Sequence, residues 1–248
     1  MISVCIASHN GSKYIKEQLE SILSQLESED EIIVSDDGST DDTIAILKQL
    51  NDFRIKIFYY KQSENPLKGA QKSIRFATKN FENALSKASG DIIFLCDQDD
   101  VWYPDKINIC KDLLKKYDII KHDYSIIDEN GKLVQERVYD AATQRNRSLY
   151  HLWRELPFRG CCTAFKRKVL NKALPFPNDC LQHDTWIGMI ARMSGFRFYY
   201  LDKPLIYHRH HSNNASELTV PNSLIYKIKY RLKLLSQIIK YKRNRRYY

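Results

Sequence analysis

Short apolar runs and helically spaced apolar positions alternate along the first hundred residues of this chain. Strand-like runs are expected at 2–7, 31–35, 54–60 and 92–96. Between them, apolar residues recur every three or four positions over 13–26, 43–50 and 73–89, which predicts helices. Strands that alternate with helices are typical of a doubly wound sheet. We therefore expect an α/β fold with a Rossmann-like, mostly parallel sheet and flanking helices.

The second half of the chain has a less regular pattern. It predicts helices over 106–116, 168–173 and 186–193, and strands over 119–127, 196–201 and 205–207. Asp128-Glu129-Asn130-Gly131 is typical of a hairpin turn. Residues 140–155 are polar with scattered Leu and Trp and predict no clear element. From Leu224 the spacing is helical again.

Size and composition favour one folded domain followed by a tail. The chain has 248 residues, of which 43% are hydrophobic, and no run approaches the ~20 apolar residues of a membrane-spanning helix. The N-terminus begins as a strand without a basic region or a cleavage site, so we expect a mature cytoplasmic start. We place the domain at residues 1–217 and the tail at 218–248.

The positive charge of the chain is concentrated in this tail. The formal net charge is +9, and no acidic residue follows Glu217. The tail carries nine cations, so residues 1–217 are formally neutral. Helical spacing places one set of apolar residues on a single face, namely Ile225, Ile228, Leu232, Leu235 and Ile239.

Such a basic amphipathic helix suits the surface of an anionic membrane, which we favour as its partner. A helix that packs on the domain with a frayed basic end is the alternative. We expect no nucleic-acid partner, because no recognised nucleic-acid-binding module accompanies the charge.

The six cysteines do not have the spacing of a zinc site or of a disulfide framework. None forms a C-x-x-C pair, and Cys5 and Cys96 lie in predicted core strands. Reduced structural thiols are therefore expected.

Three carboxylates follow the apolar run at 92–96, namely Asp97, Asp99 and Asp100. Neighbouring carboxylates repel one another and stay ionised together only when solvated or when a cation lies among them. Oxygen ligands at a strand end suit a hard divalent cation, Mg²⁺ or Mn²⁺. An acidic turn that caps the next helix is the plainer interpretation of these residues.

A second acidic strand end makes the cation site the better interpretation. Asp36 and Asp37 follow the run at 31–35, and Gly38 permits a tight turn. Ser39 or Thr40 could cap the helix that begins at Thr43, and the two aspartates could themselves serve as such a cap. In doubly wound sheets, ligands bind beyond the carboxyl ends of the strands, so both acidic turns are expected on one edge.

The order of four motifs resembles family 2 glycosyltransferases of the GT-A fold. The motifs are Ser8-His9-Asn10-Gly11, Ser35-Asp36-Asp37-Gly38-Ser39-Thr40-Asp41, Asp97-Gln98-Asp99-Asp100-Val101-Trp102 and His183-Asp184. Pro104-Asp105-Lys106 and the stretch from Pro204 to Asn214 resemble the bacterial rhamnosyltransferase-like branch. The resemblance covers residues 2–214 and implies a role for each matched residue.

On the donor side, the resemblance implies nucleotide contacts for Ser8, Asn10, Asp36, Asp37 and Asp97. Asp99 would be the direct ligand of Mg²⁺ or Mn²⁺, with the late histidine His211 near the metal or the diphosphate.

On the acceptor side, the resemblance implies that Asp184 is the general base, with Trp102, Gly160 and His183 nearby. On local grounds Asp184 could equally cap its helix, Trp102 could pack in the core, and Gly160 could be a backbone requirement. The three histidines His208, His210 and His211 could belong to a solvated loop, and a zinc site is not expected.

Two features depart from the family pattern. His208 stands where a Tyr commonly precedes the late Arg, and the loop from Asn65 to Asn80 is longer than the branch leads us to expect.

The implied activity is an inverting, metal-dependent transfer of a sugar from a dTDP- or UDP-sugar, with L-rhamnose as the favoured donor sugar. The acceptor would be a bacterial surface polysaccharide or its lipid-linked precursor, at the cytoplasmic face of the membrane. A nucleotidyltransferase is one alternative, although Ser8-His9-Asn10-Gly11 lacks the Gly-rich, basic first loop that it would need. A non-catalytic basic module that binds membranes is the other.

Overall fold

The computed structural model describes residues 1–62, 69–138, 148–155, 158–211 and 224–244. Its strands are β1 (Ile2–Ser8), β2 (Glu31–Asp36), β3 (Ile55–Tyr59), β4 (Ile92–Cys96), β5 (Val101–Trp102), β6 (Ile119–Ile127), β7 (Leu133–Gln135), β8 (Thr163–Lys166) and β9 (Phe198–Arg209). Its helices are α1 (Ile15–Leu23), α2 (Thr43–Gln49), α3 (Gly69–Lys87), α4 (Lys106–Lys116), α5 (Leu149–Glu155), α6 (Arg167–Ala173), α7 (His183–Met193) and α8 (Leu224–Asn244).

The expected strands and helices of the first half are all present, with ends that differ by a few residues. The second half corrects three expectations. The strands expected at 196–201 and 205–207 are one strand, β9, which stays paired with β6 through two register shifts. Helix α5 lies in the stretch that predicted no element, and α7 begins at His183 rather than at Trp186.

The sheet has the order β3-β2-β1-β4-β8-β6-β9-β5, with β7 on β6. Strands β3, β2, β1 and β4 are parallel, as the alternating pattern predicts. Beyond β4 the sheet is mixed, because β8 runs antiparallel to both β4 and β6 while β9 runs parallel to β6.

These pairings give β1, β2, β4, β6 and β9 one common direction, so that their carboxyl ends share one edge of the sheet. The order 3-2-1-4 also places a topological switch point at β1 and β4. In open α/β sheets this is where ligands bind. The loops after β1 and β4 are therefore the first place to look for a site.

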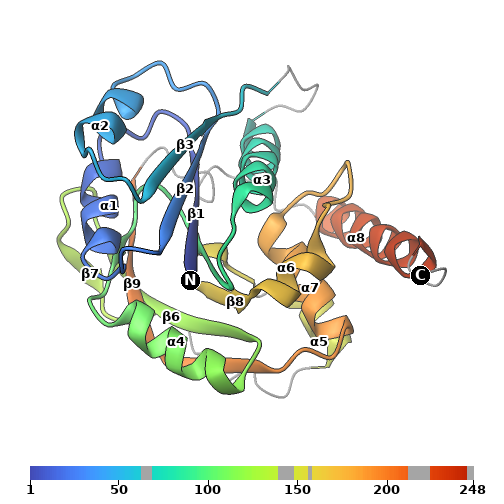
Figure 1. Ribbon diagram of the computed structural model, residues 1–248. Coiled ribbons are helices and arrows are strands. Elements are labelled where there is room, and N and C mark those ends of the chain that lie inside the picture. Colours follow the sequence, from blue (N-terminus) through green and yellow to red (C-terminus); the bar gives the residue numbers. More distant parts are fainter. Residues whose placement is uncertain (63–68, 139–147, 156–157, 212–223, 245–248) are drawn as a thin grey trace.

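Two apolar cores cover the two faces of the sheet. One joins the sheet to α1, α2 and α4, through residues such as Leu19, Leu47 and Cys110. The other joins it to α3, α6 and α7, through residues such as Phe81 and Val169. Figure 1 shows α1 and α2 on one side of the parallel strands and α3, α6 and α7 on the other. All six cysteines are buried as free thiols, as the spacing predicts.

Helix α8 packs on this domain through one face and leaves another face open. Leu234 and Ile238 are buried in the core on the α7 side, and Tyr241 meets the Trp186 ring edge-on at 5.6 Å. The apolar face that the sequence predicts for the tail is a different one. Four of its five members, Ile228, Leu232, Leu235 and Ile239, are 48, 57, 42 and 44% exposed. The side chain of the fifth, Ile225, lies outside the described part of the helix.

Helix α8 thus both packs on the domain and exposes an apolar stripe. Figure 1 shows this helix at the outer side of the molecule. The expected boundary of the tail at residues 217 and 218 lies outside the described residues. Among the helices of the described residues, none has the length and apolar character needed to cross a membrane.

Candidate active site

The loops that follow β1 and β4 are joined by the Gln98 side chain. Its Oε1 accepts a hydrogen bond from the His9 backbone amide at 2.9 Å, and its Nε2 donates to the His9 carbonyl at 3.0 Å. A Cβ on Gly11 would lie 2.5 Å from Gln98 Oε1, so glycine leaves the room that this crossing needs. Two hydrogen bonds from one side chain therefore join the two loops at the switch point of the sheet.

Asp36 builds the turn after β2. Its buried carboxylate accepts hydrogen bonds from the backbone amide of Ser39 at 2.9 Å, from the Ser39 hydroxyl at 2.5 Å and from the Ser8 hydroxyl at 3.2 Å. Ser8 and Asp36 are thus occupied with each other at the ends of neighbouring parallel strands.

The expectation that these turn residues cap α2 is wrong. The helix begins after Asp42, and no side chain caps it there. Instead the Asp41 carboxylate accepts from the Thr43 and Ser12 backbone amides, at 3.1 and 3.0 Å. These hydrogen bonds, with that of the Thr43 hydroxyl, lower the pKa of Asp41 to about 2 despite the opposing effect of burial.

Asp37 and Asn10 lie at the surface of the same edge. Asp37 is partly exposed and accepts two hydrogen bonds from Gln62, one from its backbone amide and one from its side chain, each 2.9 Å long. The His9 ring bonds to the Asp37 carbonyl at 2.9 Å. Asn10 has a backbone φ of 49°, and its side-chain oxygen accepts a hydrogen bond from the Thr40 backbone amide. His9 thus connects Asp37 to Gln98 and hence to the acidic turn after β4.

The acidic turn gathers Asp97, Asp99 and Asp100 within four residues. Burial and the neighbouring charges of Asp100 and Asp99 raise the pKa of Asp97 to about 7. Asp99 Oδ2 lies 2.9 Å from His211 Nε2, and both side chains are mostly buried. The two residues predicted to lie at the metal, 112 positions apart, are therefore adjacent in space.

Asp100 and His208 form a buried ion pair that ties this turn to β9. Asp100 Oδ1 lies 2.7 Å from His208 Nδ1. Burial would lower the pKa of His208, but the Asp100 carboxylate outweighs it and raises the pKa to about 9. His208, which stands where the family commonly has a Tyr, is thus the ion-pair partner of Asp100.

Arg209 extends the same connection. It donates to the Asp99 carbonyl at 3.1 Å and to Glu17 at 2.7 Å, and its guanidinium lies over the Tyr14 ring.

Two sets of residues could hold a cation. One buried set is Asp100, Cys161 and His208, whose ligand atoms lie within 4.8 Å of one another. His208 is already paired with Asp100, whose carboxylate raises the pKa of the imidazole to about 9, so a metal would have to displace a proton there. The other is the pair of Asp99 and His211, whose Oδ2 and Nε2 atoms lie 2.9 Å apart, with Asp97 two residues before Asp99. Carboxylates are the ligand type that a hard divalent cation prefers, so this turn fits such a cation.

The predicted acceptor-side residues meet at the start of α7. A Cβ on Gly160 would lie 2.9 Å from His183 Nε2 and 3.7 Å from Asp184 Cβ, so Gly160 packs directly on both. The His183 ring stacks on Phe81 with centroids 4.0 Å apart, and burial lowers its pKa, which keeps the ring neutral. Asp184 accepts the Thr185 backbone amide at 2.6 Å. The N-cap of α7 is Gln182 and no side chain caps the helix, so Asp184 lies in its first turn, partly exposed, without serving as its cap.

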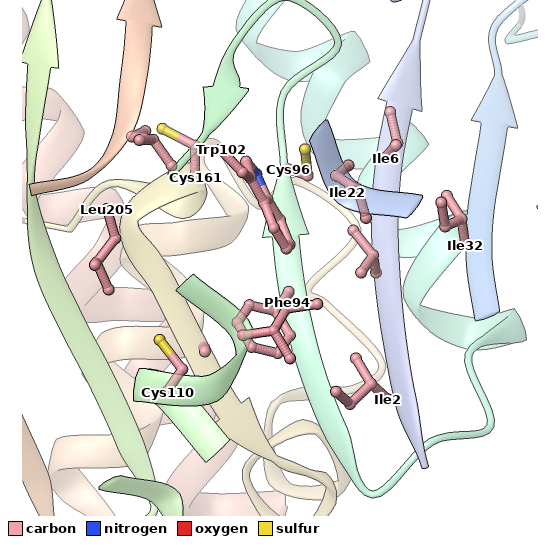
Figure 2. Close-up of a cluster of buried hydrophobic side chains, with 14 of the residues drawn as sticks. Ile2, Ile6, Ile22, Ile32, Phe94, Cys96, Trp102, Cys110, Cys161 and Leu205 are labelled. Carbon is pink, nitrogen blue, oxygen red and sulfur yellow. The ribbon is translucent and has the colours of Figure 1, made fainter. Parts of the chain in front are cut away.

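Trp102 is a core residue in this structure. It is buried, its ring lies 5.4 Å from that of Phe94, and the ammonium of Lys106 lies 4.1 Å from its centroid. Figure 2 shows it among the apolar side chains beside β4, near Phe94 and Cys96. The core packing that its sequence position allowed accounts for these contacts.

A mixed α/β sheet with an acidic turn at its switch point is an open α/β fold of the kind that binds ligands at that edge. The model of glycosyl transferase family 2 matches residues 3–174, and the chain belongs to this family. The expected family resemblance is thereby confirmed.

Three curated relatives show the range of similar proteins. An uncharacterized glycosyltransferase of Nostoc sp., alr2836, is 28% identical over 86% of this chain and 66% of its own length. The dTDP-rhamnosyl transferase RfbG of Shigella flexneri is 28% identical over 91% of this chain and 77% of its own. The chain spans only 35% of a Rickettsia conorii relative, RC0461, at 30% identity.

Solved structures confirm the GT-A fold. TarS of S. aureus, crystallised with UDP-GlcNAc, has a TM-score of 0.69 at 20% identity over 94% of this chain and 66% of that chain. The mannosyltransferase PcManGT of Pyrobaculum calidifontis, solved with GDP-Man and Mn²⁺, has a TM-score of 0.60 at 20% identity over 86% of this chain and 58% of that chain.

Several residues of the site had no separate role in the sequence interpretation. Gln98 lies inside the acidic motif, and Gln62 closes on Asp37 from 25 residues away. Lys121 is buried in β6 and lines a small cavity together with Asp184. A lysine directly after two isoleucines at the start of a strand is a signal that could have drawn attention to it.

The Asp100–His208 pair predicts a specific pH dependence of stability. A histidine pKa raised from 6.5 to about 9 contributes stability that is complete below pH 6.5 and is lost as the pH rises through 9. In buffer without divalent cations, we expect the pair to lose about 3 kcal/mol of unfolding free energy between pH 6 and pH 9.5.

Urea unfolding of the wild type and of His208→Gln across this range measures the difference. The variant should lack this component of the pH dependence. The ion pair would be contradicted if the unfolding free energies of both proteins changed equally with pH. A His208 ring that titrates near pH 6.5 by NMR in the wild type would also contradict it.

Proposed function

We propose that the protein transfers a sugar from a nucleoside diphosphate to a hydroxyl group of a growing bacterial polysaccharide or of its lipid-linked precursor. The donor is a dTDP- or UDP-sugar, with dTDP-L-rhamnose first, and the anomeric configuration is inverted. One observation carries the proposal: the turn Asp97–Asp100 lies at the switch point and is hydrogen-bonded to His9 of the loop after β1, whose ring in turn bonds to Asp37 after β2. The name of the Shigella relative supports rhamnose.

Asp37 and Asp97 carry the nucleotide contacts in this proposal, and Ser8, Asn10 and Asp36 support them. The hydrogen bonds of Asp36 to Ser39 and Ser8 fix the turn from which Asp37 projects. Asn10 holds the neighbouring loop through Thr40. A preformed edge of this kind reduces the ordering cost of donor binding.

Asp99 and His211 would hold the divalent cation, Mg²⁺ or Mn²⁺, with Asp97 beside them. When bound, the cation supplies positive charge that stabilises the departing nucleoside diphosphate. The chain's own contribution is to fix the ligands, through Gln98, the Asp100–His208 pair and Arg209.

Asp184 is the proposed general base. The acceptor oxygen attacks the anomeric carbon as the bond from that carbon to the diphosphate breaks, and the hydroxyl proton passes to the Asp184 carboxylate. In one displacement the base and the leaving group lie on opposite sides of the sugar. Gly160 packs against Asp184 and His183, and the absence of a Cβ on Gly160 leaves room for the His183 ring.

Two isosteric substitutions separate donor binding from catalysis. Asp99→Asn should lower the Mn²⁺-dependent affinity for a nucleotide sugar at least tenfold, as measured by thermal stabilisation at increasing donor concentration. Asp184→Asn should keep donor affinity within about twofold but slow the release of nucleoside diphosphate by 10²- to 10⁴-fold, the usual contribution of a general base.

The assay screens dTDP-L-rhamnose, UDP-GlcNAc, UDP-glucose and GDP-mannose with Mn²⁺. Turnover of Asp184→Asn near the wild-type rate would refute its role as the base. Stabilisation by none of these donors would count against the proposed function as a whole.

We also propose that α8 attaches the protein to the inner face of an anionic membrane. The exposed stripe Ile228, Leu232, Leu235 and Ile239 has i, i+4, i+7 and i+11 spacing, and lysines and arginines flank it along the helix. Each cation near an anionic surface contributes about 1 kcal/mol. The domain contacts of Leu234 and Ile238 leave this stripe free to enter the headgroup region.

Sedimentation with vesicles of phosphatidylserine and phosphatidylcholine tests this attachment. The double variant Leu232→Ser/Leu235→Ser should bind at least tenfold more weakly, because burying each leucine contributes about 2 kcal/mol. The matched control is Leu133→Ser/Val134→Ser, which removes exposed apolar side chains on β7 and should bind like the wild type. Equal binding of the α8 variant and the wild type would exclude the stripe as the contact.

A further inference from the structure

Helix α5 lies against α8 and is joined to it by hydrogen bonds. The Trp153 indole Nε1 donates to the Arg231 carbonyl at 3.1 Å, and Arg231 Nε donates to the Arg154 carbonyl at 3.1 Å. Leu152 of α5 is buried in the same core as Leu234 of α8 and the apolar residues of α7. Figure 1 shows the three helices on one side of the sheet. Helices α5 and α8 are therefore a packed pair that shares its core with α7.

Helix α5 lies on the flank of α8 that also carries the exposed apolar stripe. At about 100° of rotation per residue, Arg231, which contacts α5, and the stripe residue Leu235 lie on one flank of the buried Leu234. Gln237 lies on the other flank, where its Nε2 donates to Asp179, between α6 and α7, at 2.7 Å. Helix α5 therefore borders the stripe, whereas the segment between α6 and α7 meets the opposite flank.

Helix α5 adds exposed apolar side chains to this border. Leu149 and Tyr150 are 47 and 60% exposed. They precede Trp153 by four and three positions, which places them on the face of α5 that meets α8. The centroid of the Tyr150 ring lies 6.1 Å from that of Trp153. Tyr and Trp suit a membrane–water interface, because each combines an apolar ring with a polar group.

The charges of the two helices indicate what covers this surface. The described part of α8 exposes five cations, Lys227, Lys229, Lys240, Lys242 and Arg243. Within the described helices α5 and α8, Glu155 carries the sole carboxylate, and it is paired with Arg154 at 3.1 Å. Two copies of such a surface repel each other, whereas an anionic membrane attracts it. The charge therefore favours a membrane over a second copy of this chain.

We propose that α5 and α8 form one surface that lies in the headgroup region of an anionic membrane, with Leu149 and Tyr150 entering it beside the α8 stripe. This inference rests on the proposed attachment through α8, to which it adds a second element and an orientation. Because α5 and α7 share one core, the membrane lies on the side of the sheet that carries the proposed base, Asp184. A lipid-linked acceptor in that membrane approaches the protein from this side.

Sedimentation with vesicles of phosphatidylserine and phosphatidylcholine tests the contribution of α5. Leu149→Ser/Tyr150→Ser should bind about tenfold more weakly than the wild type, because two apolar side chains no longer enter the interface. Leu133→Ser/Val134→Ser is again the matched control, since it removes two exposed apolar side chains from β7. Thermal stabilisation by a nucleotide sugar should be the same in all three proteins, which separates membrane binding from donor binding.

Quenching by brominated phosphatidylcholine in the same vesicles locates α5 directly. Tyr150→Trp should lose more fluorescence than the wild type does. The control Phe53→Trp, at a position before β3 that is 76% exposed, should show no added quenching.

The possible outcomes separate α5 from α8. Equal quenching of the two added tryptophans would overturn the role of α5 alone, and so would wild-type binding of Leu149→Ser/Tyr150→Ser while Leu232→Ser/Leu235→Ser binds weakly. Wild-type binding of both double variants would overturn the attachment through α8 as well. A dimer in solution that Leu149→Ser/Tyr150→Ser dissociates, measured by light scattering, would assign the surface to a second copy instead. None of these results bears on sugar transfer, which the donor screen tests separately.

Discussion

The structure depends on how three carboxylates are kept together in one turn. Asp97, Asp99 and Asp100 follow β4 directly, and unshielded carboxylates at this spacing repel one another. Asp100 is neutralised by the buried imidazolium of His208, and Asp99 is held by His211. The remaining repulsion and burial fall on Asp97, whose pKa rises to about 7. A divalent cation among these groups would relieve that repulsion, which is why the turn is suited to hold one.

Strand direction explains why these partners meet. Because β8 runs antiparallel to both β4 and β6, and β9 runs parallel to β6, the carboxyl end of β9 returns to the edge where β4 ends. His208 and Arg209 at that end reach the acidic turn from more than 100 residues away. Gln98 then joins the turn to the loop after β1, and His9 joins it to Asp37. The proposed donor side is thus one connected edge, while Asp184 and the cavity that it lines lie on the α7 side of the sheet.

The sequence predicted the regular parts of this arrangement well. Strand–helix alternation identified the parallel strands, and the two acidic turns follow β2 and β4, which share the edge of the sheet. Local patterns could not show that the Asp36 carboxylate accepts hydrogen bonds within its own turn, or that Asp41 accepts the Thr43 amide at the start of α2. Both contacts depend on turn geometry. The short strands β5 and β8 have no alternation long enough to detect. In the tail, helical spacing identified the apolar stripe correctly, but the face that packs on the domain became clear only from the contacts of Leu234 and Ile238.

The central claim is that the turn after β4 holds a cation-bound nucleotide sugar. A crystal structure grown with Mn²⁺ and dTDP or UDP, with diffraction recorded at the manganese absorption edge, tests it most directly. We expect one anomalous peak in contact with Asp99 and within reach of His211, with the nucleotide base near Asp37. Manganese bound at the buried Asp100, Cys161 and His208 set instead, or a nucleotide located away from the edge formed by β1, β2 and β4, would contradict this account.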